Sequence, residues 1–222
     1  MNNKTDLLEN YLQLVLEANN RVNLTRIDSI EQAHILHLED SLVALPEIEA
    51  APEGLYGDLG TGGGFPGVPL AIVTGRETLL VDSVKKKMAI VESILDQMEL
   101  SPQIKTYAGR IEELSLERKG GFSVLTARAL TQLPSLIELA APLLKKGGQL
   151  ICYKANISEE EMKGALDIEE LVGMRRTSQR RLTLSDDITH REIIVFTKIG
   201  KPKLKLPRRI GLAQHSPLKP RG

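Results

Sequence analysis

The sequence predicts an α/β protein built around one mostly parallel sheet, and three observations support this prediction. Short apolar runs alternate with longer segments whose apolar residues recur at helical spacing. Several runs are apolar throughout, as in "ETLLVDS" (77–83), which is typical of strands covered on both faces. A glycine-rich stretch, "GDLGTGGGFPG" (57–67), joins the first run to the next helix. The 222 residues suffice for one domain with a small cap.

Two helices are expected before the sheet. Over residues 5–20, Leu8, Leu12, Val15 and Leu16 share one apolar stripe. A second helix is predicted over 29–45, with Ser29 as its N-cap and Pro46 at its end. We therefore expect residues 1–50 to form an N-terminal helical cap.

The alternating elements of the sheet domain follow over residues 51–199. The first strand lies in "GLYGDLG" (54–60), and Pro66 suits the first turn of the helix after the glycine loop. The next strands are expected within 77–83, 104–110, 121–130 and 149–154, and the next helices over 85–99, 133–148 (closed by Gly147) and 159–168. Two closing segments, 171–184 and 191–199, have no helix between them and predict an antiparallel hairpin at the sheet edge.

Charge is distributed unevenly along a chain whose net charge is zero. Residues 1–60 hold 3 Lys/Arg against 11 Asp/Glu, whereas residues 175–222 hold 13 against 3. The last segment, 200–222, has four prolines, seven Lys/Arg and no acid, so we expect a basic extended tail that is not a packed element. This distribution indicates a polyanionic partner, with two merely solvated ends as the alternative.

Composition also excludes several classes of protein. No apolar run reaches the roughly 20 residues of a membrane span, and the N-terminus has no signal pattern. The single Cys152 excludes an internal disulfide and a cysteine-rich metal site, and its place within a strand predicts a core thiol. We expect a cytoplasmic protein with no membrane or metal partner and take a monomer as the default.

The glycine loop predicts a ligand site, because ligands of open α/β sheets bind at the carboxyl ends of the strands. A dinucleotide-binding loop would have a small third residue where this chain has Phe65, and no Lys-Ser/Thr pair follows for a Walker loop. S-adenosylmethionine has no phosphate and fits better, since Gly60 and Gly62 let a ligand lie against the backbone.

Charged residues stand where strands end around this loop. Asp58 precedes the loop and is expected to orient the ammonium group of the cofactor, directly or through water. Asp82 ends the next strand, where a carboxylate can accept both ribose hydroxyls. Arg110 and the residues up to Glu113 follow the third strand, beside the expected adenine. Arg128 ends the fourth strand and is expected to hold the cofactor carboxylate or the substrate, with a surface ion pair as the alternative.

The chain resembles a known family, the glucose-inhibited division protein B or ribosomal small subunit methyltransferase G enzymes. The matching pieces run nearly from end to end. They are "VNLT" (22–25), "HLEDSL" (37–42), "DLGTGGGFPGVPLAI" (58–72), "LVDSVKKK" (80–87), "GRIEEL" (109–114), "TARAL" (126–130), "LLKKGGQLICYK" (143–154) and "PRRIG" (207–211).

The resemblance implies a class I S-adenosylmethionine-dependent methyltransferase fold, a Rossmann-like, mostly parallel seven-stranded sheet with an N-terminal helical cap. The implied activity is transfer of a methyl group from S-adenosyl-L-methionine to nitrogen-7 of a guanosine in small-subunit (16S) ribosomal RNA, with S-adenosyl-L-homocysteine as the product. The implied partner is that RNA or the small ribosomal subunit.

The resemblance also implies site residues. Cofactor contacts fall on Gly60, Phe65, Ile111, Glu112 and Arg128, and Asp82 matches the expected ribose carboxylate. The polar positions that cluster around the family's pocket fall on Asn23, His37, Asp40, Ser41, Arg110 and Lys154. The chain departs from the family twice, with Lys86-Lys87 in place of Lys-Arg and Lys154-Ala155 in place of Lys-Gly.

The chemistry agrees with these residue types. Guanine nitrogen-7 carries a free lone pair and no proton, so methylation needs no general base and depends on alignment. Asp40 is our hypothesis for an acceptor beside the cationic product. His34, His37 and Asp40 stand three apart, but no further ligand cluster supports a metal, and we expect His37 either to pack against the glycine loop or to contact RNA.

A basic stripe around the pocket mouth is the expected RNA surface. Its candidates are Lys85–Lys87, Arg175, Arg176, Arg180, Arg181, Arg208 and Arg209. Few aromatic residues are present, so recognition should depend on RNA shape and one splayed base, with Phe65 the best-placed residue for stacking. Three rivals stay open: a nicotinamide-dependent oxidoreductase, a methyltransferase for a small molecule or protein, and a non-catalytic RNA-binding module.

Overall fold

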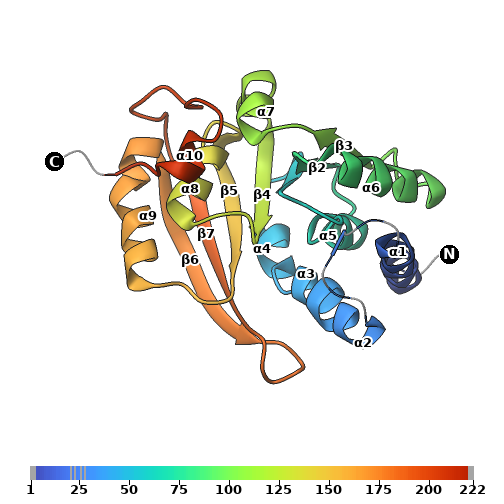
Figure 1. Ribbon diagram of the computed structural model, residues 1–222. Helices are drawn as coiled ribbons and strands as arrows, with labels where there is room; N and C mark the ends of the chain where they lie inside the picture. The colour runs from blue at the N-terminus through green and yellow to red at the C-terminus, as the bar shows by residue number, and fades with distance from the viewer. Residues whose placement is uncertain (1–3, 21, 23, 26, 28, 220–222) are drawn as a thin grey trace.

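One seven-stranded sheet with helices on both faces forms the protein in the computed structural model, which describes residues 4–219 except 21, 23, 26 and 28 (Figure 1). The strands are β1 (Tyr56–Leu59), β2 (Thr78–Asp82), β3 (Ile104–Ala108), β4 (Phe122–Arg128), β5 (Leu144–Lys154), β6 (Met174–Thr183) and β7 (His190–Lys198). They lie in the order β3-β2-β1-β4-β5-β7-β6. Strands β1 to β5 are parallel, and β7 pairs antiparallel with β5 and with the edge strand β6. The α/β prediction and the antiparallel hairpin at the edge are confirmed.

The strand order reverses between β1 and β4. The chain runs outward from β1 through β2 to β3 and returns to β4 on the other side of β1. Leu59 at the end of β1 pairs with Ala127, next to the end of β4. Because ligands bind where the order reverses, this point positions the site between the glycine loop and Arg128.

Each face of the sheet has its own helices. One face carries α1 (Lys4–Asn19), α4 (Leu45–Ala50), α5 (Gly67–Thr74) and α6 (Lys85–Gln97), and the other carries α7 (Ile111–Glu117), α8 (Leu133–Ala140), α9 (Glu159–Val172) and α10 (Leu212–His215). Strand β2 shows why both faces are apolar: Leu79 and Val81 pack under α7 and α8, whereas Leu80 packs under α5 and α6.

The N-terminal cap differs from its prediction in the second helix. Ser29 caps α2 (Ile30–Ala33) as expected, accepting a hydrogen bond of 3.2 Å from the Gln32 amide. A π-helical turn, His34–Glu39, then interrupts the helix before α3 (Asp40–Leu42). Pro46 lies in the first turn of α4 and does not simply end the preceding helix.

Two further boundaries were predicted wrongly. The helix predicted over 133–148 ends at Ala140, and Gly147 lies inside β5 with φ of 80° rather than at a helix cap. Helix α7 follows β3 without having been expected. It is short, and a hydrogen bond of 3.0 Å from the Arg110 amide to the Glu113 carboxylate caps it.

The C-terminal segment is a packed element, so the prediction of an extended, unpacked tail is wrong. Leu206 and Ala213 belong to the core under α8. Arg208 pairs with the buried Glu138 of α8 at 2.7 and 2.6 Å, and Ser135 of the same helix donates to the Ala213 carbonyl at 2.7 Å. A basic segment packs here because α8 supplies the missing acid. The predicted division into a cap and a sheet domain stays a prediction.

The described part of the chain was searched for a membrane-spanning helix and for a metal site. None of its helices combines the length and apolar character that a bilayer span requires. Nor does it contain a cluster of three or more His, Cys, Asp or Glu side chains suited to a metal ion. Cys152 is fully buried, and burial raises the pKa of its thiol to about 12, which confirms a core residue.

Candidate active site

The glycine loop is held from within the protein by Asp58. This carboxylate is fully buried and accepts hydrogen bonds from the Thr126 hydroxyl at 2.6 Å and the Gly67 amide at 3.0 Å. Burial raises the pKa of Asp58, and these hydrogen bonds oppose that rise. Both oxygens therefore brace the loop against β4 and α5. Because Asp58 is fully buried, its carboxylate has no exposed surface for the expected contact with the cofactor ammonium group.

Close helix–strand contact comes from Gly67, the first residue of α5. A Cβ atom at this position would lie 2.3 Å from Leu80 Cδ2 and 2.9 Å from Asp58 Cβ, so only glycine fits without displacement. The small residue that a dinucleotide loop would place at position 65 is thus supplied two residues later. This is how the loop accommodates Phe65.

The cap locks the glycine loop from outside through Tyr11 of α1. Its buried hydroxyl donates to the Gly63 carbonyl at 2.8 Å. A Cβ atom on Gly64, where φ is 88°, would lie 1.9 Å from the same hydroxyl oxygen. The cap and the loop are therefore fitted to each other at atomic contact.

His37 packs against the glycine loop, which was one of its two expected roles. Its ring stacks on Phe65 with centroids 4.4 Å apart, and its Nε2 lies 2.9 Å from the Thr25 hydroxyl. Burial, with the nearby Arg128, lowers the pKa of His37 to about 4, so its ring is neutral at pH 7. Phe65 is 5% exposed and also meets Tyr11 edge-on at 5.5 Å, so its ring is already covered.

Asp82 connects the end of β2 to the glycine loop. Its two oxygens accept hydrogen bonds from the Gly62 amide at 3.0 Å and the Val84 amide at 2.8 Å. Because a carboxylate has about four acceptor positions, roughly two stay available to a ligand. The side chain is half-buried at the edge of a cavity, as a ribose-binding acid requires.

The cavity itself lies at the carboxyl ends of β1, β2 and β3. It has a volume of about 90 Å³, and its lining residues are Gly60, Val81, Asp82, Ser83, Gly109, Arg110, Ile111, Glu112, Leu130, Leu139 and Gln214. Small-molecule pockets commonly measure about 300 Å³ or more, so only part of a cofactor fits this shape. The lining is mixed, with two carboxylates, the Arg110 side chain, glycine backbone and apolar side chains, and it suits a nucleoside.

An ion cluster that the sequence did not indicate joins the cap to the sheet. The buried Asp40 carboxylate receives Arg128 Nη1 at 2.7 Å, Arg191 Nε at 2.6 Å and Arg191 Nη2 at 3.0 Å. Arg128 Nη1 also donates to the Leu36 carbonyl at 3.0 Å. Asp40 is thus engaged by two guanidinium groups and is not a free acceptor, whereas the Nε and Nη2 donors of Arg128 have no partner within the described residues.

Comparison with known proteins decides the family. The family described as rRNA small subunit methyltransferase G matches residues 4–186. The ribosomal RNA small subunit methyltransferase G of Oenococcus oeni is 33% identical over 98% of this chain and 90% of its own. That of Deinococcus radiodurans is 37% identical over 93% and 83%. The chain belongs to this family.

Solved structures agree on the fold of this methyltransferase. An O-methyltransferase from Bacillus cereus in complex with SAH superposes with a TM-score of 0.60 at 19% identity, covering 85% of this chain and 90% of that one. A geranyl diphosphate methyltransferase in complex with SAM gives 0.57 at 11% identity, covering 72% and 85%. The protein has the class I S-adenosylmethionine-dependent methyltransferase fold, and S-adenosylmethionine is its cofactor.

The remaining predicted site residues of the methyltransferase lie in different places. Arg110 is exposed at the N-terminus of α7 and lines the cavity with Ile111 and Glu112. Lys154 does not line this cavity. Its ammonium pairs with Glu161 of α9 at 2.6 Å and donates to the Thr131 carbonyl at 2.9 Å. Asn23 lies outside the described residues.

The hydroxyl of Ser41 is also engaged within the cap. It donates to the His37 carbonyl, and Tyr153 donates to the Ser41 carbonyl at 2.7 Å. Its backbone thereby ties the cap to β5, so Ser41 is a structural group in this arrangement.

Several members of the predicted basic stripe have acidic partners inside the protein. Arg180 pairs with Glu47 at 2.6 Å, Arg181 with Glu192 at 3.2 Å, and Arg208 with Glu138. Lys85 and Lys86 are exposed at the start of α6, near Asp82. The stripe is therefore smaller than the sequence suggested.

Two participants escaped prediction. Arg191 comes from β7, and only the strand order brings it to Asp40. Gln214 reaches the cavity from α10, and the Gly211 amide donates to Glu112 Oε1 at 2.7 Å. The "PRRIG" block was the one available signal, because a sequence block that resembles the family in an otherwise basic segment indicates a constraint beyond charge.

Proposed function

We propose that this methyltransferase transfers a methyl group from S-adenosylmethionine to nitrogen-7 of a guanosine in small-subunit ribosomal RNA. The proposal includes a cytoplasmic monomer that uses no metal. The observation that supports it best is the meeting of a bare glycine turn, Asp82 and the paired Arg128 at the strand-order reversal of a chain in this family.

The cofactor would lie along the carboxyl ends of β1 to β4. Asp82 would accept the ribose hydroxyls with its two remaining acceptor positions, and the backbone at Gly60 and Gly62 would border the methionine part. Ile111 and Glu112 would edge the adenine. Arg128 would hold the cofactor carboxylate with its uncommitted donors, and Asp58 would keep the loop in shape.

Leu130 is one of the side chains that line the cavity of about 90 Å³, so its position limits the space for a cofactor. The preceding residue, Ala129, has φ of 53°, a left-handed conformation that costs alanine about 1–2 kcal/mol. This left-handed residue lies directly beside a residue of the cavity lining.

The chemistry would depend on positioning. The bound cofactor supplies a methyl group on a sulfonium, and guanine nitrogen-7 has no proton to remove. His37 is neutral and stacked on Phe65, and Cys152 is a buried thiol, so neither is arranged as a proton carrier or nucleophile. Asp40 would act as a positioning residue by fixing Arg128 and Arg191, which differs from our hypothesis of a direct acceptor.

Methyl transfer from labelled S-adenosylmethionine tests the proposal. Purified small subunits, free small-subunit RNA and a panel of small molecules would be offered, and label mapped to a guanosine nitrogen-7 is the expected result. Label only in a small molecule would replace RNA as the proposed substrate.

Arg128→Lys gives the matched test of the site. It keeps the charge but loses the planar fork, so transfer should fall more than tenfold. Arg118→Lys, on an exposed arginine at the end of α7, is the control and should leave transfer unchanged. Equal activities of the two variants would remove Arg128 from the mechanism.

A further inference from the structure

A second cavity lies at the opposite edge of the sheet from the cofactor site. It has a volume of about 640 Å³, and its lining residues are Lys119, Gly120, Ala141, Pro142, Leu144, Lys145, Lys146, Lys198, Ile199, Gly200, Lys201, Pro202, Leu204, Lys205 and Leu206. The amino end of β5 and the carboxyl end of the antiparallel β7 meet here. From Arg191 to Lys198 the path along β7 is roughly 24 Å, so about this distance separates the cavity from the Asp40 ion cluster.

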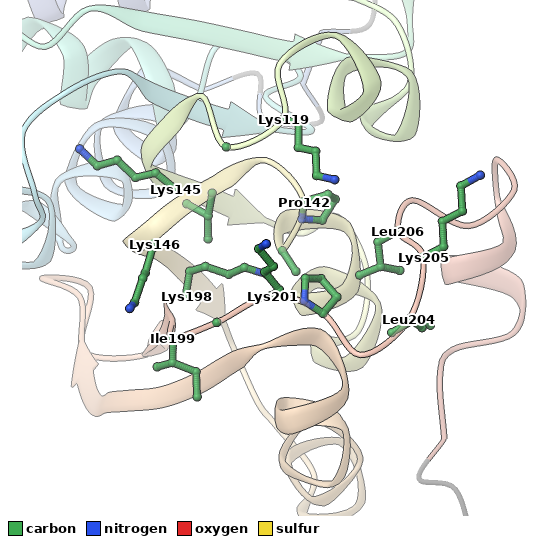
Figure 2. Close-up of a pocket in the computed structure, with 15 residues that line it drawn as sticks. Lys119, Pro142, Lys145, Lys146, Lys198, Ile199, Lys201, Leu204, Lys205 and Leu206 are labelled. Carbon is green, nitrogen blue, oxygen red and sulfur yellow. The ribbon is translucent and has the colours of Figure 1, made fainter.

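Six lysines surround this cavity, and it has no acidic lining residue. Figure 2 shows Lys145 and Lys146 on one side, Lys119 above and Lys205 on the other side. The described part of the chain places no carboxylate within ion-pair distance of any of the six. Elsewhere the same molecule pairs its buried or half-buried cations with acids, as at Arg128, Arg180 and Arg208. Six lysines without an acidic partner are therefore grouped around this one cavity.

Lys198 differs from the other lysines of the cavity because it is buried. Its side chain is 6% exposed, and its ammonium donates to the Val172 carbonyl at 2.9 Å, which leaves further donors. Burial, together with the charge of Lys119, lowers the pKa of Lys198 to about 8. An anion in the cavity would offset both effects.

The floor of the cavity is apolar. Pro142 and Leu144 come from the connection into β5 and from its first residue, and Leu204 and Leu206 come from the segment that was expected to be an unpacked tail. A ligand with charged groups at the rim and an uncharged body over this floor fits the arrangement. Nucleotides of RNA, with phosphates outside and ribose inside, have this chemistry.

We propose that this lysine-lined cavity is a second RNA-binding site, which holds the phosphate backbone of the substrate at a distance from the methylated base. Lysine binds phosphate as a point charge, and the cavity contains no arginine, so an anion there would be held by charge and not by bidentate hydrogen bonds. No aromatic side chain lines it, so contact there is independent of base sequence. The RNA must be extended or folded over roughly 24 Å to reach both sites. The inference rests on the proposed function only in taking RNA as the polyanion.

The test compares two triple variants of the full chain that remove the same charge. One is Lys119→Gln, Lys201→Gln and Lys205→Gln; the buried Lys198 is left intact so that folding is preserved. The matched control is Lys4→Gln, Lys105→Gln and Lys163→Gln, on exposed lysines of α1, β3 and α9. Binding of radiolabelled small-subunit RNA would be measured between about 50 and 300 mM salt, with cofactor affinity as the check on folding.

The cavity variant should bind RNA about 10- to 100-fold more weakly at 0.1 M salt, and its salt slope should fall by about 2 to 3 relative to the control. Cofactor affinity should be equal in both. Equal RNA affinities would overturn the proposal. So would a loss confined to labelled poly-glutamate or to inorganic tripolyphosphate, which would assign the cavity to an acidic protein or a small phosphate compound.

The outcomes separate this inference from the proposed function. If the wild-type chain binds RNA through these lysines but transfers no methyl group to it, the inference holds and the proposed activity fails. If it methylates RNA while the two triple variants bind RNA alike, the activity holds and the inference fails.

Discussion

Replacing Tyr11 with phenylalanine isolates one hydrogen bond between the cap and the glycine loop. The tyrosine is fully buried, and its hydroxyl donates to the Gly63 carbonyl at 2.8 Å. The phenylalanine ring keeps the edge-on contact with Phe65. Because the buried Gly63 carbonyl loses its partner, the free energy of unfolding should fall by about 1–3 kcal/mol. For a chain of this length that is a decrease in Tm of roughly 2–12 °C.

The same change should weaken the cofactor site. A loop that is no longer tied to α1 must be ordered when the cofactor binds, so part of the lost energy appears as weaker affinity. Since about 1.4 kcal/mol corresponds to tenfold, Kd for S-adenosylmethionine should rise by up to roughly tenfold. Urea unfolding followed by circular dichroism and calorimetric titration of the cofactor would measure the two effects.

Tyr107→Phe is the matched control. Its hydroxyl lies 3.3 Å from Glu117 Oε1 in an exposed contact, so its loss should change stability by less than about 0.5 kcal/mol. The reasoning would be refuted if Tyr11→Phe stayed within 0.5 kcal/mol of the wild type, or if the control lost as much.

Three further predictions concern the same region. Gly67→Ala should destabilise the fold by about 1–3 kcal/mol in thermal unfolding, because the new methyl group would lie 2.3 Å from Leu80 Cδ2, and an unchanged Tm would contradict the contact. The pKa of His37 is about 4 in the folded protein and about 6.5 in the unfolded chain, so acidification protonates the unfolded state first. The free energy of unfolding should therefore fall as the pH drops from 7 toward 4, by about 3 kcal/mol in all. His37→Gln should remove that part of the pH dependence, and parallel pH profiles of the two proteins would refute it. Asp40→Asn removes the carboxylate that Arg128 and Arg191 share, so the free energy of unfolding should fall by about 2–4 kcal/mol. Turnover should fall more than cofactor affinity. Unchanged stability and turnover would show that the ion cluster is dispensable.

The sequence predicted the sheet well because its strands are local apolar runs and the glycine loop has a distinct composition. Asp82 was predicted from its place at the end of the second strand and from the family resemblance, and it lines the cavity at the carboxyl ends of the strands. The partners of Asp58 and Asp40 could not be predicted, because they depend on which strand ends the topology brings together. Composition gave a wrong prediction for the basic, proline-rich segment 200–222, which was expected to be an extended, unpacked tail, although Glu138 of another helix neutralises Arg208.

The role of Arg128 also could not be decided from the sequence. A cofactor or substrate contact and an ion pair were set against each other, but the structure pairs Arg128 with Asp40 through one nitrogen and leaves its other donors uncommitted among the described residues. An ion pair that fixes a side chain and a ligand contact made by the same side chain are compatible. Sequence patterns do not register this because they identify residue types and not individual atoms.

The packed C-terminal segment has a consequence for biosynthesis. The ribosome makes the glycine loop and strands β1 to β7 before Gly211, whose amide holds Glu112, and before Gln214, which lines the cofactor cavity. A nascent chain can therefore assemble most of its sheet while one wall of the cofactor pocket is still missing. A translation product that stops before Leu206 would also lack the apolar anchor under α8. Formation of the whole cofactor pocket therefore depends on residues that follow every strand of the sheet.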